Sequence, residues 1–243
     1  YDSDLKLKVG DYVVVPFGKS ELTGVVWDEF EKKTGKNFAI KKVSRKIDVP
    51  SLKKNIITEI SATLAFSALQ NNDKVGLILF SDNVELFIPP SKGKTHVLRI
   101  IRELIEFKPL SKKTDISEAL RFLIGVIKKK SIAFILSDFI SVDYEKTLKI
   151  CANKHDVTGI RIFDKLEEKI PNMGIVKMFD QETEETKLID TSSSLLRKKY
   201  ESYNIANSKR FNQLFSKNGA GTLNCRTDES YVKKLLSYFK KRG

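Results

Sequence analysis

The chain has 243 residues, of which 41% are hydrophobic, enough for one large domain or for a small and a medium one. Its net charge of +13 is uneven, because residues 191–243 carry 12 basic and 3 acidic side chains. No apolar run approaches the ~20 residues that span a bilayer, and no signal peptide is visible, so these features argue against a membrane-spanning or exported chain.

The basic C-terminal part suits contact with nucleic acid, anionic lipid or an acidic partner, and equally suits a simple solvated face. The two cysteines, Cys151 and Cys225, have no spacing motif, so we expect core thiols of a cytoplasmic protein rather than a disulfide. The chain begins at Tyr1 without methionine, so we expect a fragment whose upstream signals are missing.

Residues 1–52 are expected to form a small β module that is separate from the rest of the chain. Short strands are predicted around Val13–Val15, over Leu22–Trp27 with Gly24 allowing close approach or a bulge, and over Phe38–Val43. Tight turns such as Pro16-Phe17-Gly18 and few helix signals favour a partial barrel.

The order Val-Gly-Asp, Val-Pro-Phe-Gly and Gly-Val-Val resembles the N-terminal DNA-binding domain of primosomal protein N′, the replication-restart helicase. The resemblance covers residues 1 to about 54 and implies a pocket that holds the 3′ end of a single DNA strand. It places Tyr1, Gly18 and Lys41 at that pocket, with Lys19 adding positive charge. Without the resemblance, Gly18 is a turn residue and Lys41 an exposed strand residue.

The second domain is predicted to occupy residues 53–243, with the junction near Pro50. An apolar stripe through Ile56, Ile60 and Leu64 predicts a helix as far as Asn71. Asn83–Pro89 should form an antiparallel edge strand, which Pro89-Pro90 would keep from pairing further. Lys94–Phe107 shows the periodicity of an amphipathic helix.

The stretch from Lys112 to Ile140 predicts a loop, a helix, a strand and an acidic loop. Thr114 or Asp115 can cap the helix, which would run to Ile127. Ser131–Leu136 is typical of a strand buried on both faces. Ligands of open parallel sheets bind where strand carboxyl ends meet loops, so Thr114 and Asp138 are expected to point there.

The remaining segments continue the alternation of helices and strands, which indicates a parallel sheet with right-handed crossovers. In chain order we expect a helix, a strand, an edge hairpin, a long helix, a strand and a terminal helix capped by Asp228. The predicted ranges are Tyr144–His155, Val157–Phe163, Gly174–Phe179 with Glu185–Ile189, Ser192–Lys217 and Gly219–Arg226.

This pattern resembles a von Willebrand factor A-like domain, which binds Mg²⁺ through an Asp-x-Ser-x-Ser loop, a Thr loop and an Asp loop. Thr114 and Asp138 match the last two. More narrowly, residues 71–82, 87–90 and 96–101 resemble the bacterial group called domain of unknown function fifty-eight, over residues 56–243. The first metal loop is absent, since Asp48 and Ser51 are the only oxygen donors near its place.

The expected fold class is therefore α/β, a Rossmann-like parallel sheet flanked by helices and lacking its first, central strand. Removing that strand leaves two neighbours with unpaired backbone groups, each costing about 1–3 kcal/mol if buried. Either Phe38–Val43 fills the position or the sheet stays defective. We interpret the chain as two fused or truncated reading frames, a hypothesis that sequencing across the junction in source DNA tests.

The available chemistry favours binding over catalysis. One hydroxyl and one carboxylate, from Thr114 and Asp138, should hold Mg²⁺ weakly or not at all; the neighbours that could assist them are Ser81, Asp82, Asp115 and Ser137. His96 and His155 lack partners at zinc-ligand spacing. No phosphate-binding Gly-rich loop, and hence no helicase motor, is present, and no nucleophile stands beside a base. We expect no enzyme activity.

The family resemblance implies a cytoplasmic adaptor that binds a protein partner, often an ATPase of the MoxR type. The alternative function is binding of single-stranded DNA through residues 1–50. The residues do not decide between these two classes.

Overall fold

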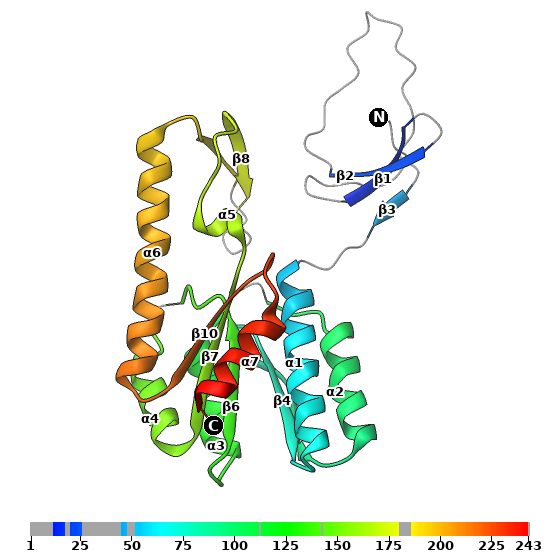
Figure 1. Ribbon diagram of the computed structural model, residues 1–243, viewed down its shortest axis with the longest axis vertical. Helices are drawn as coiled ribbons and strands as arrows, with labels where there is room; N and C mark the ends of the chain where they lie inside the picture. Colours follow the sequence, from blue (N-terminus) through cyan, green and yellow to red (C-terminus); the bar gives the residue numbers. More distant parts are fainter. Residues whose placement is uncertain are drawn as a thin grey trace, which may run out of the picture. The chain divides into compact units, whose positions relative to one another are not determined.

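The computed structural model describes residues 12–17, 20–25, 45–47, 52–111, 113–141, 143–179 and 186–242 (Figure 1). The chain divides into two compact units, Tyr1–Ser51 and Leu52–Gly243, and each is described by itself.

The first unit contains a three-stranded antiparallel sheet in the order β2-β1-β3. The strands are β1 (Tyr12–Phe17), β2 (Ser20–Val25) and β3 (Arg45–Ile47). Val13 pairs with Gly24 in an unbroken register, so the bulge considered at this glycine does not occur. The strand expected over Phe38–Val43 lies outside the described residues.

The second unit is mixed α/β and is organised around a parallel three-stranded sheet in the order β10-β7-β6. These strands are β6 (Ile132–Ser137), β7 (Asp156–Phe163) and β10 (Gly221–Arg226). The central strand β7 is buried from Val157 to Phe163, because it has a strand on each side and helices on both faces.

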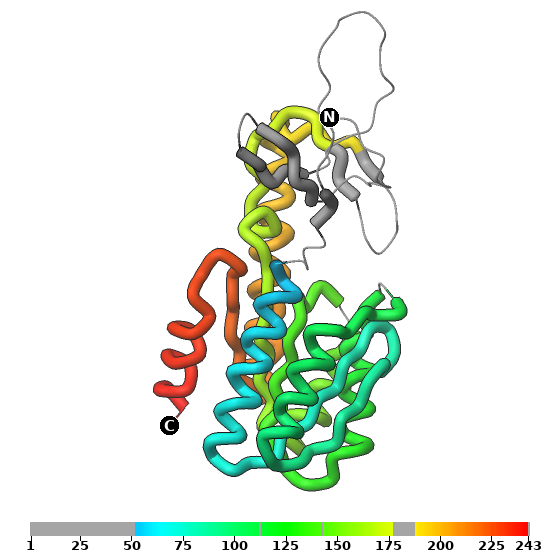
Figure 2. The backbone as a smooth tube through the Cα atoms, turned by 90° about the vertical axis from the view of Figure 1, so that its right-hand side faces the viewer, coloured from blue at the N-terminus to red at the C-terminus, as the bar shows by residue number. Residues whose placement is uncertain are grey.

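Helices cover both faces of this sheet (Figures 1 and 2). One face packs against α1 (Leu52–Gln70) and α7 (Tyr231–Arg242). The other packs against α3 (Ile116–Val126), α4 (Glu145–Lys154) and α6 (Ser194–Lys217). The first core centres on Ile60, Ile160, Ile162, Cys225 and Leu235. The second includes Leu120, Leu148, Cys151, Phe211 and Phe215.

Strands β4 (Val75–Phe80) and β5 (Val84–Ser91) form a separate antiparallel sheet, packed on α2 (Lys94–Glu106). Contrary to expectation, β5 continues through its two prolines and pairs Ser91 with Val75. The register shifts between Val75 and Leu77, and a bulge tolerates prolines that donate no hydrogen bond. Gly76 is needed there, because a Cβ would lie 2.9 Å from the Ile88 carbonyl oxygen.

The edges of β4 and β6 differ from what a central strand should show. The two strands belong to different sheets, and among the described residues neither has a partner on its second edge. Only Ile135 of β6 is buried, and Ile132 is 67% exposed. β6 is covered on both faces, as expected, since Ile135 belongs to one core and Phe134 and Leu136 pack against the other. Its burial is incomplete because it lies at the end of its sheet.

The predicted hairpin exists but does not extend the main sheet. Strands β8 (Ile175–Phe179) and β9 (Thr186–Asp190) form a two-stranded sheet of their own, preceded by the short helix α5 (Lys165–Glu168). Thr191 is fully buried at its base, where its hydroxyl donates to the Gly174 carbonyl at 2.6 Å and accepts from the Met173 N–H at 2.9 Å.

The terminal helix α7 begins differently from the prediction. Its first turn is capped by Ser230, whose hydroxyl accepts the Lys233 N–H at 3.5 Å. Asp228, the expected cap, instead accepts from Arg226 Nε at 2.5 Å. The nearby guanidinium offers a charge-assisted bond, which is stronger than a cap on a neutral N–H.

In the part of the chain that the structure describes, no helix has the length and apolar character needed to cross a bilayer.

His155 gives the second unit a predicted acid sensitivity. It is 1% exposed at the end of α4, and neither ring nitrogen bonds a described protein group. Burial, and then the charge of Lys154, lower its pKa below the ordinary 6.5. The unfolded chain therefore binds a proton that the folded chain excludes, and stability falls as pH drops below about 6.5 by up to ~1.4 kcal/mol per pH unit.

Urea unfolding at a series of pH values from 7.5 downward measures this effect. We expect the midpoint of wild-type protein to fall more steeply with acid than that of His155→Leu. Carboxylate titration contributes equally to both proteins, so parallel slopes would contradict a neutral, buried imidazole.

Candidate functional site

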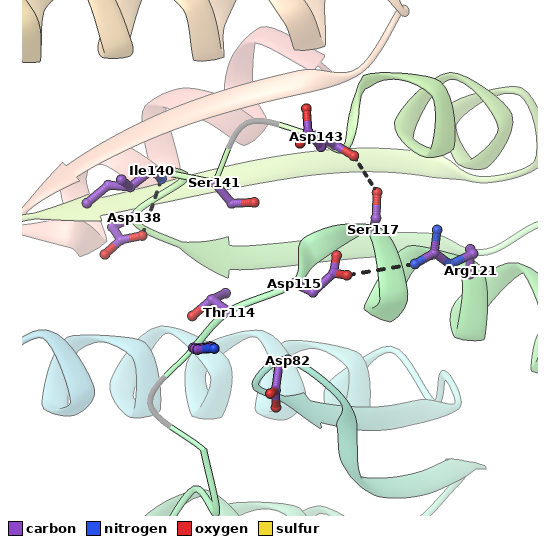
Figure 3. A pocket seen from close by; sticks show the side chains of 10 residues that line it. Asp82, Thr114, Asp115, Ser117, Arg121, Asp138, Ile140, Ser141 and Asp143 are labelled. Atoms are coloured by element: carbon purple, nitrogen blue, oxygen red, sulfur yellow. Dashed lines mark hydrogen bonds and ion pairs between the residues drawn. The ribbon is translucent and has the colours of Figure 1, made fainter. Parts of the chain in front are cut away.

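A polar pocket of about 700 Å³ lies where the loops after β4 and β6 meet the start of α3 (Figure 3). Asp82 comes from the first loop, Thr114 precedes α3, and Asp138 follows β6. The two residues expected to hold a metal thus line one pocket. The other lining residues are Lys113, Asp115, Ser117, Arg121, Ile140, Ser141 and Asp143.

Asp115 builds the wall beside Thr114. Its N–H donates to the Ser81 carbonyl at 2.8 Å, which joins the end of β4 to the start of α3. Its Oδ1 accepts from the Glu118 N–H at 3.1 Å and caps the helix, while its Oδ2 lies 3.8 Å from Arg121. Of the two capping candidates the helix uses Asp115, which leaves the exposed Thr114 available to a ligand.

Ser117 fixes the loop after β6 to the same helix. Its buried hydroxyl donates to the Asp143 carbonyl at 2.7 Å and lies 3.3 Å from the Thr147 hydroxyl. The pocket floor is therefore tied together by backbone and hydroxyl bonds from three separate segments.

Phe139 anchors the loop that carries Asp138. It is 5% exposed, and its ring centroid lies 4.5 Å from that of Phe211 and 5.3 Å from that of Phe215. Its φ of 55° is unusual for a residue other than glycine. This conformation turns the chain so that Phe139 enters the core while Asp138 and Ile140 line the pocket.

Asp138 is already engaged by other groups. Its Oδ1 accepts from the Ile140 N–H at 3.4 Å, and its Oδ2 lies 3.5 Å from Lys53 Nζ. The Lys53 ammonium also pairs with Glu167 at 2.5 Å. Lys53 stands in the first turn of α1, where a cation is unfavourable for the helix dipole, and these two carboxylates compensate for it.

Arg161 of β7 is 6% exposed and interacts electrostatically with the same two carboxylates, Asp138 and Glu167. Its guanidinium stacks on the Phe163 ring at 4.4 Å from the centroid. Burial lowers the pKa of Arg161, while Glu167, Asp138 and Glu168 oppose that shift. The carboxyl edge of the sheet therefore carries fixed positive charge in addition to its carboxylates.

Asp82 stays ionised at the opposite wall. Burial raises the pKa of its carboxyl group, but hydrogen bonds outweigh that effect, so the pKa lies below its ordinary value. The donors include the Ser81 hydroxyl at 3.2 Å and the Asn83 amide at 3.3 Å.

The carboxylate oxygens that line this pocket fit a divalent cation poorly. Asp115 and Asp138 already accept N–H bonds, and both have cations beside them, so Mg²⁺ would compete with Lys53 and Arg121. Across the described ranges 52–111, 113–141, 143–179 and 186–242, no three His, Cys, Asp or Glu side chains form a group that could hold a metal.

The sequence did not predict the roles of Lys53, Phe139 and Arg161. These residues hold or surround Asp138 but belong to neither of the two metal-loop motifs. A signal existed for Lys53, since two lysines open a helix that should favour acidic residues there. The residues predicted to bind DNA, Tyr1, Gly18, Lys19 and Lys41, lie outside the described residues.

The fold and pocket define an α/β unit with a polar site at the carboxyl ends of its strands. A family model described as "Protein of unknown function DUF58" matches residues 42–210, and the chain belongs to this family. Residues 1–66 also match the 3′DNA-binding domain (3′BD) of PriA. The two matches overlap across the junction.

Among curated proteins, the chain is 25% identical over 158 residues to the uncharacterized protein MAV169 of Mycobacterium avium, covering 64% of this chain and 93% of that protein. It is 21% identical over 134 residues to the uncharacterized protein Rv1480 of Mycobacterium tuberculosis, covering 54% of this chain. That alignment spans 42% of the length of the M. tuberculosis protein.

Among solved structures, an aerotolerance-related membrane protein from Bacteroides fragilis is similar with a TM-score of 0.50 and 15% identity, over 80% of this chain and 90% of that one. The conserved hypothetical protein BatB from Bacteroides thetaiotaomicron gives a TM-score of 0.48 and 14% identity, over 77% and 87%. At this identity the first likeness concerns the fold alone.

Proposed function

We propose that residues 53–243 act as a protein-interaction adaptor of the von Willebrand factor A type, with the pocket at the ends of β4 and β6 as its docking surface. The observation that carries the proposal is the position of Thr114 and Asp138. They come from separate loops, line one pocket and are held there by the Asp115 cap and the Phe139 anchor.

The same proposal accounts for the separation of β4 and β6 into different sheets. A von Willebrand factor A-like sheet without its first strand would leave β4 and β6 each unpaired on the edge that faces the missing strand, and the described residues have this arrangement. It would also lose the Asp-x-Ser-x-Ser oxygens, and Lys53 lies beside Asp138. The docking surface that we propose therefore depends weakly or not at all on Mg²⁺.

The proposed partner is a MoxR-type ATPase in the cytoplasm, and the adaptor itself catalyses no reaction. A pocket walled by Asp82, Asp115 and Asp138 with Lys113 and Arg121 nearby offers charges of both signs. Such a mixture suits a polar protein surface better than a small apolar ligand.

Replacing Asp138 by alanine tests the proposal. We expect affinity for a purified MoxR-type ATPase to fall at least tenfold, about 1.4 kcal/mol, because the carboxylate is lost and Lys53 keeps one partner fewer. Isothermal titration of the full chain measures it, with and without EDTA. We expect EDTA to weaken binding less than the substitution does.

Asp73→Ala is the matched control, since Asp73 is an exposed carboxylate before the amino end of β4, away from the pocket. Unchanged affinity of Asp138→Ala, or equal losses in both variants, would defeat the assignment of this pocket.

A second function, binding of single-stranded DNA at a 3′ end, is proposed for the first unit on the strength of the match over residues 1–66. Fluorescence anisotropy should show the full chain binding a strand with a free 3′ hydroxyl more tightly than one with a 3′ phosphate. Binding should weaken steeply with salt, because lysine contacts to phosphate release counterions.

Lys41→Ala should reduce this DNA affinity, while the control Lys149→Ala, an exposed lysine on α4, should not. Equal binding of free and blocked 3′ ends would leave only nonspecific attraction to a basic chain and would rule out the end-binding function.

A further inference from the structure

Neither the docking pocket nor the proposed DNA-binding unit makes use of the unpaired edges of β4 and β6. β4 pairs on one side with β5, and β6 pairs on one side with β7. In the described residues no strand occupies the other edge of either one. Unpaired edges of this kind are templates for pairing with another extended chain.

The two open strands run in the same direction toward one place. Asp82, just after β4, and Asp138, just after β6, line the same pocket, so both carboxyl ends meet there. Phe80 at the end of β4 packs against the core that contains Ile135 of β6 and Phe139. β4 and β6 are therefore neighbours without being hydrogen-bonded.

The same helices cover both strands. On one side, α1 contacts β4, and its Ile56, Ile57 and Leu64 pack against the same core as Phe134 and Leu136 of β6. On the other side, α3 contacts β4 and shares a core with Ile135. Any segment between the two strands would lie between two apolar helix faces.

β4, β6 and α1 are less buried than elements inside a complete sheet would be. In β7, which has a strand on each side, seven successive residues are buried, whereas β4 has none and β6 has one. Only Ile60 and Ala65 are buried along the 19 residues of α1, although that helix is rich in aliphatic side chains. A strand between β4 and β6 would complete the burial of all three elements.

The charge at the amino ends of β4 and β6 indicates which residues a segment bound between them should carry. Lys74 directly precedes β4, and Lys128, Lys129 and Lys130 precede β6, all exposed. The strands themselves, Val75–Phe80 and Ile132–Ser137, carry no charged side chain. Acidic residues in the bound segment would pair with the lysines, and aliphatic residues would match the uncharged strands.

We propose that β4 and β6 take up an extended segment of a partner protein, parallel to both, in which acidic residues precede about six aliphatic, preferably β-branched residues. The segment completes the sheet by backbone hydrogen bonds on both edges. This binding mode is separate from the docking pocket and does not require the ATPase.

A synthetic peptide with two aspartates followed by alternating valine and isoleucine is the probe, added to the full chain. Hydrogen exchange should slow at amides of both β4 and β6, and fluorescence anisotropy should give a saturable affinity. The matched control is the same peptide N-methylated at alternate aliphatic residues, which keeps every side chain and removes the backbone donors that face one of the two strands. We expect it to bind at least tenfold more weakly.

The double variant Lys129→Glu with Lys130→Glu should bind the acidic peptide more weakly, while Lys149→Glu on α4 should bind it as the wild type does. These lysines are exposed, so folding is preserved. Equal binding of the N-methylated peptide, or protection confined to one strand, overturns the proposal. So do amides of β4 and β6 that are already protected without peptide, because the occupant would then be Phe38–Val43 in a monomer or a second copy in a dimer, which light scattering distinguishes.

Discussion

Phe139→Ala is expected to lower the free energy of unfolding by about 3–5 kcal/mol, the range for removing a buried aromatic ring. The ring contacts Phe211, Phe215 and Tyr144 in one core and is 5% exposed. Because the backbone at Phe139 aims Asp138 into the pocket, the docking affinity should fall as well. Urea unfolding followed by circular dichroism measures the first effect.

A comparison with glycine separates the ring from the backbone. At a φ of 55° alanine is disfavoured and glycine is not, so Phe139→Gly should be more stable than Phe139→Ala by roughly 1 kcal/mol. At ordinary positions inside regular structure the order is reversed. If alanine proved the more stable of the two, the left-handed conformation of this loop would be wrong.

Gly159→Ala should also destabilise the second unit strongly, toward the upper end of the ~1–3 kcal/mol typical of overpacking. A Cβ on this residue of β7 would lie 2.6 Å and 2.7 Å from two ring atoms of Phe215 and 2.8 Å from Phe211. Both rings are at most 1% exposed and pack against each other, so moving either one away would cost packing energy.

The double variant Gly159→Ala with Phe215→Leu identifies the cause. Leucine lacks the two ring atoms that the new methyl group would meet, so the double variant should be more stable than the sum of the single losses predicts. Residues in direct contact couple by about 0.5–3 kcal/mol, which unfolding midpoints resolve. Strict additivity would mean that the glycine is required for another reason.

The local periodicity of the sequence was enough to place most elements of the second unit. The helix after Asp115 and the strand after Ser131 form within a residue of their predicted starts, because capping chemistry and apolar spacing act over one turn or one strand. The bulge at Pro89-Pro90 was not anticipated, since whether a proline ends a strand depends on what its neighbour does at that point.

The site was anticipated only in part, for a related reason. Thr114 and Asp138 could be assigned to one edge because strand carboxyl ends gather there. Lys53 is 85 residues from Asp138 in the chain, and nothing local records that its ammonium would lie beside that carboxylate. Long-range ion pairs depend on how helices are laid across a sheet, which periodicity does not encode.

The sequence alone determined the order of helices and strands in the second unit and the family, because these depend on neighbouring residues and on motifs read in succession. Only the tertiary structure decided that the described strands of the second unit separate into three sheets, with β4 and β6 in different ones, and that Phe139 enters the core. Both depend on which distant segments are present to pair and pack, and backbone hydrogen bonding between strands is blind to sequence distance.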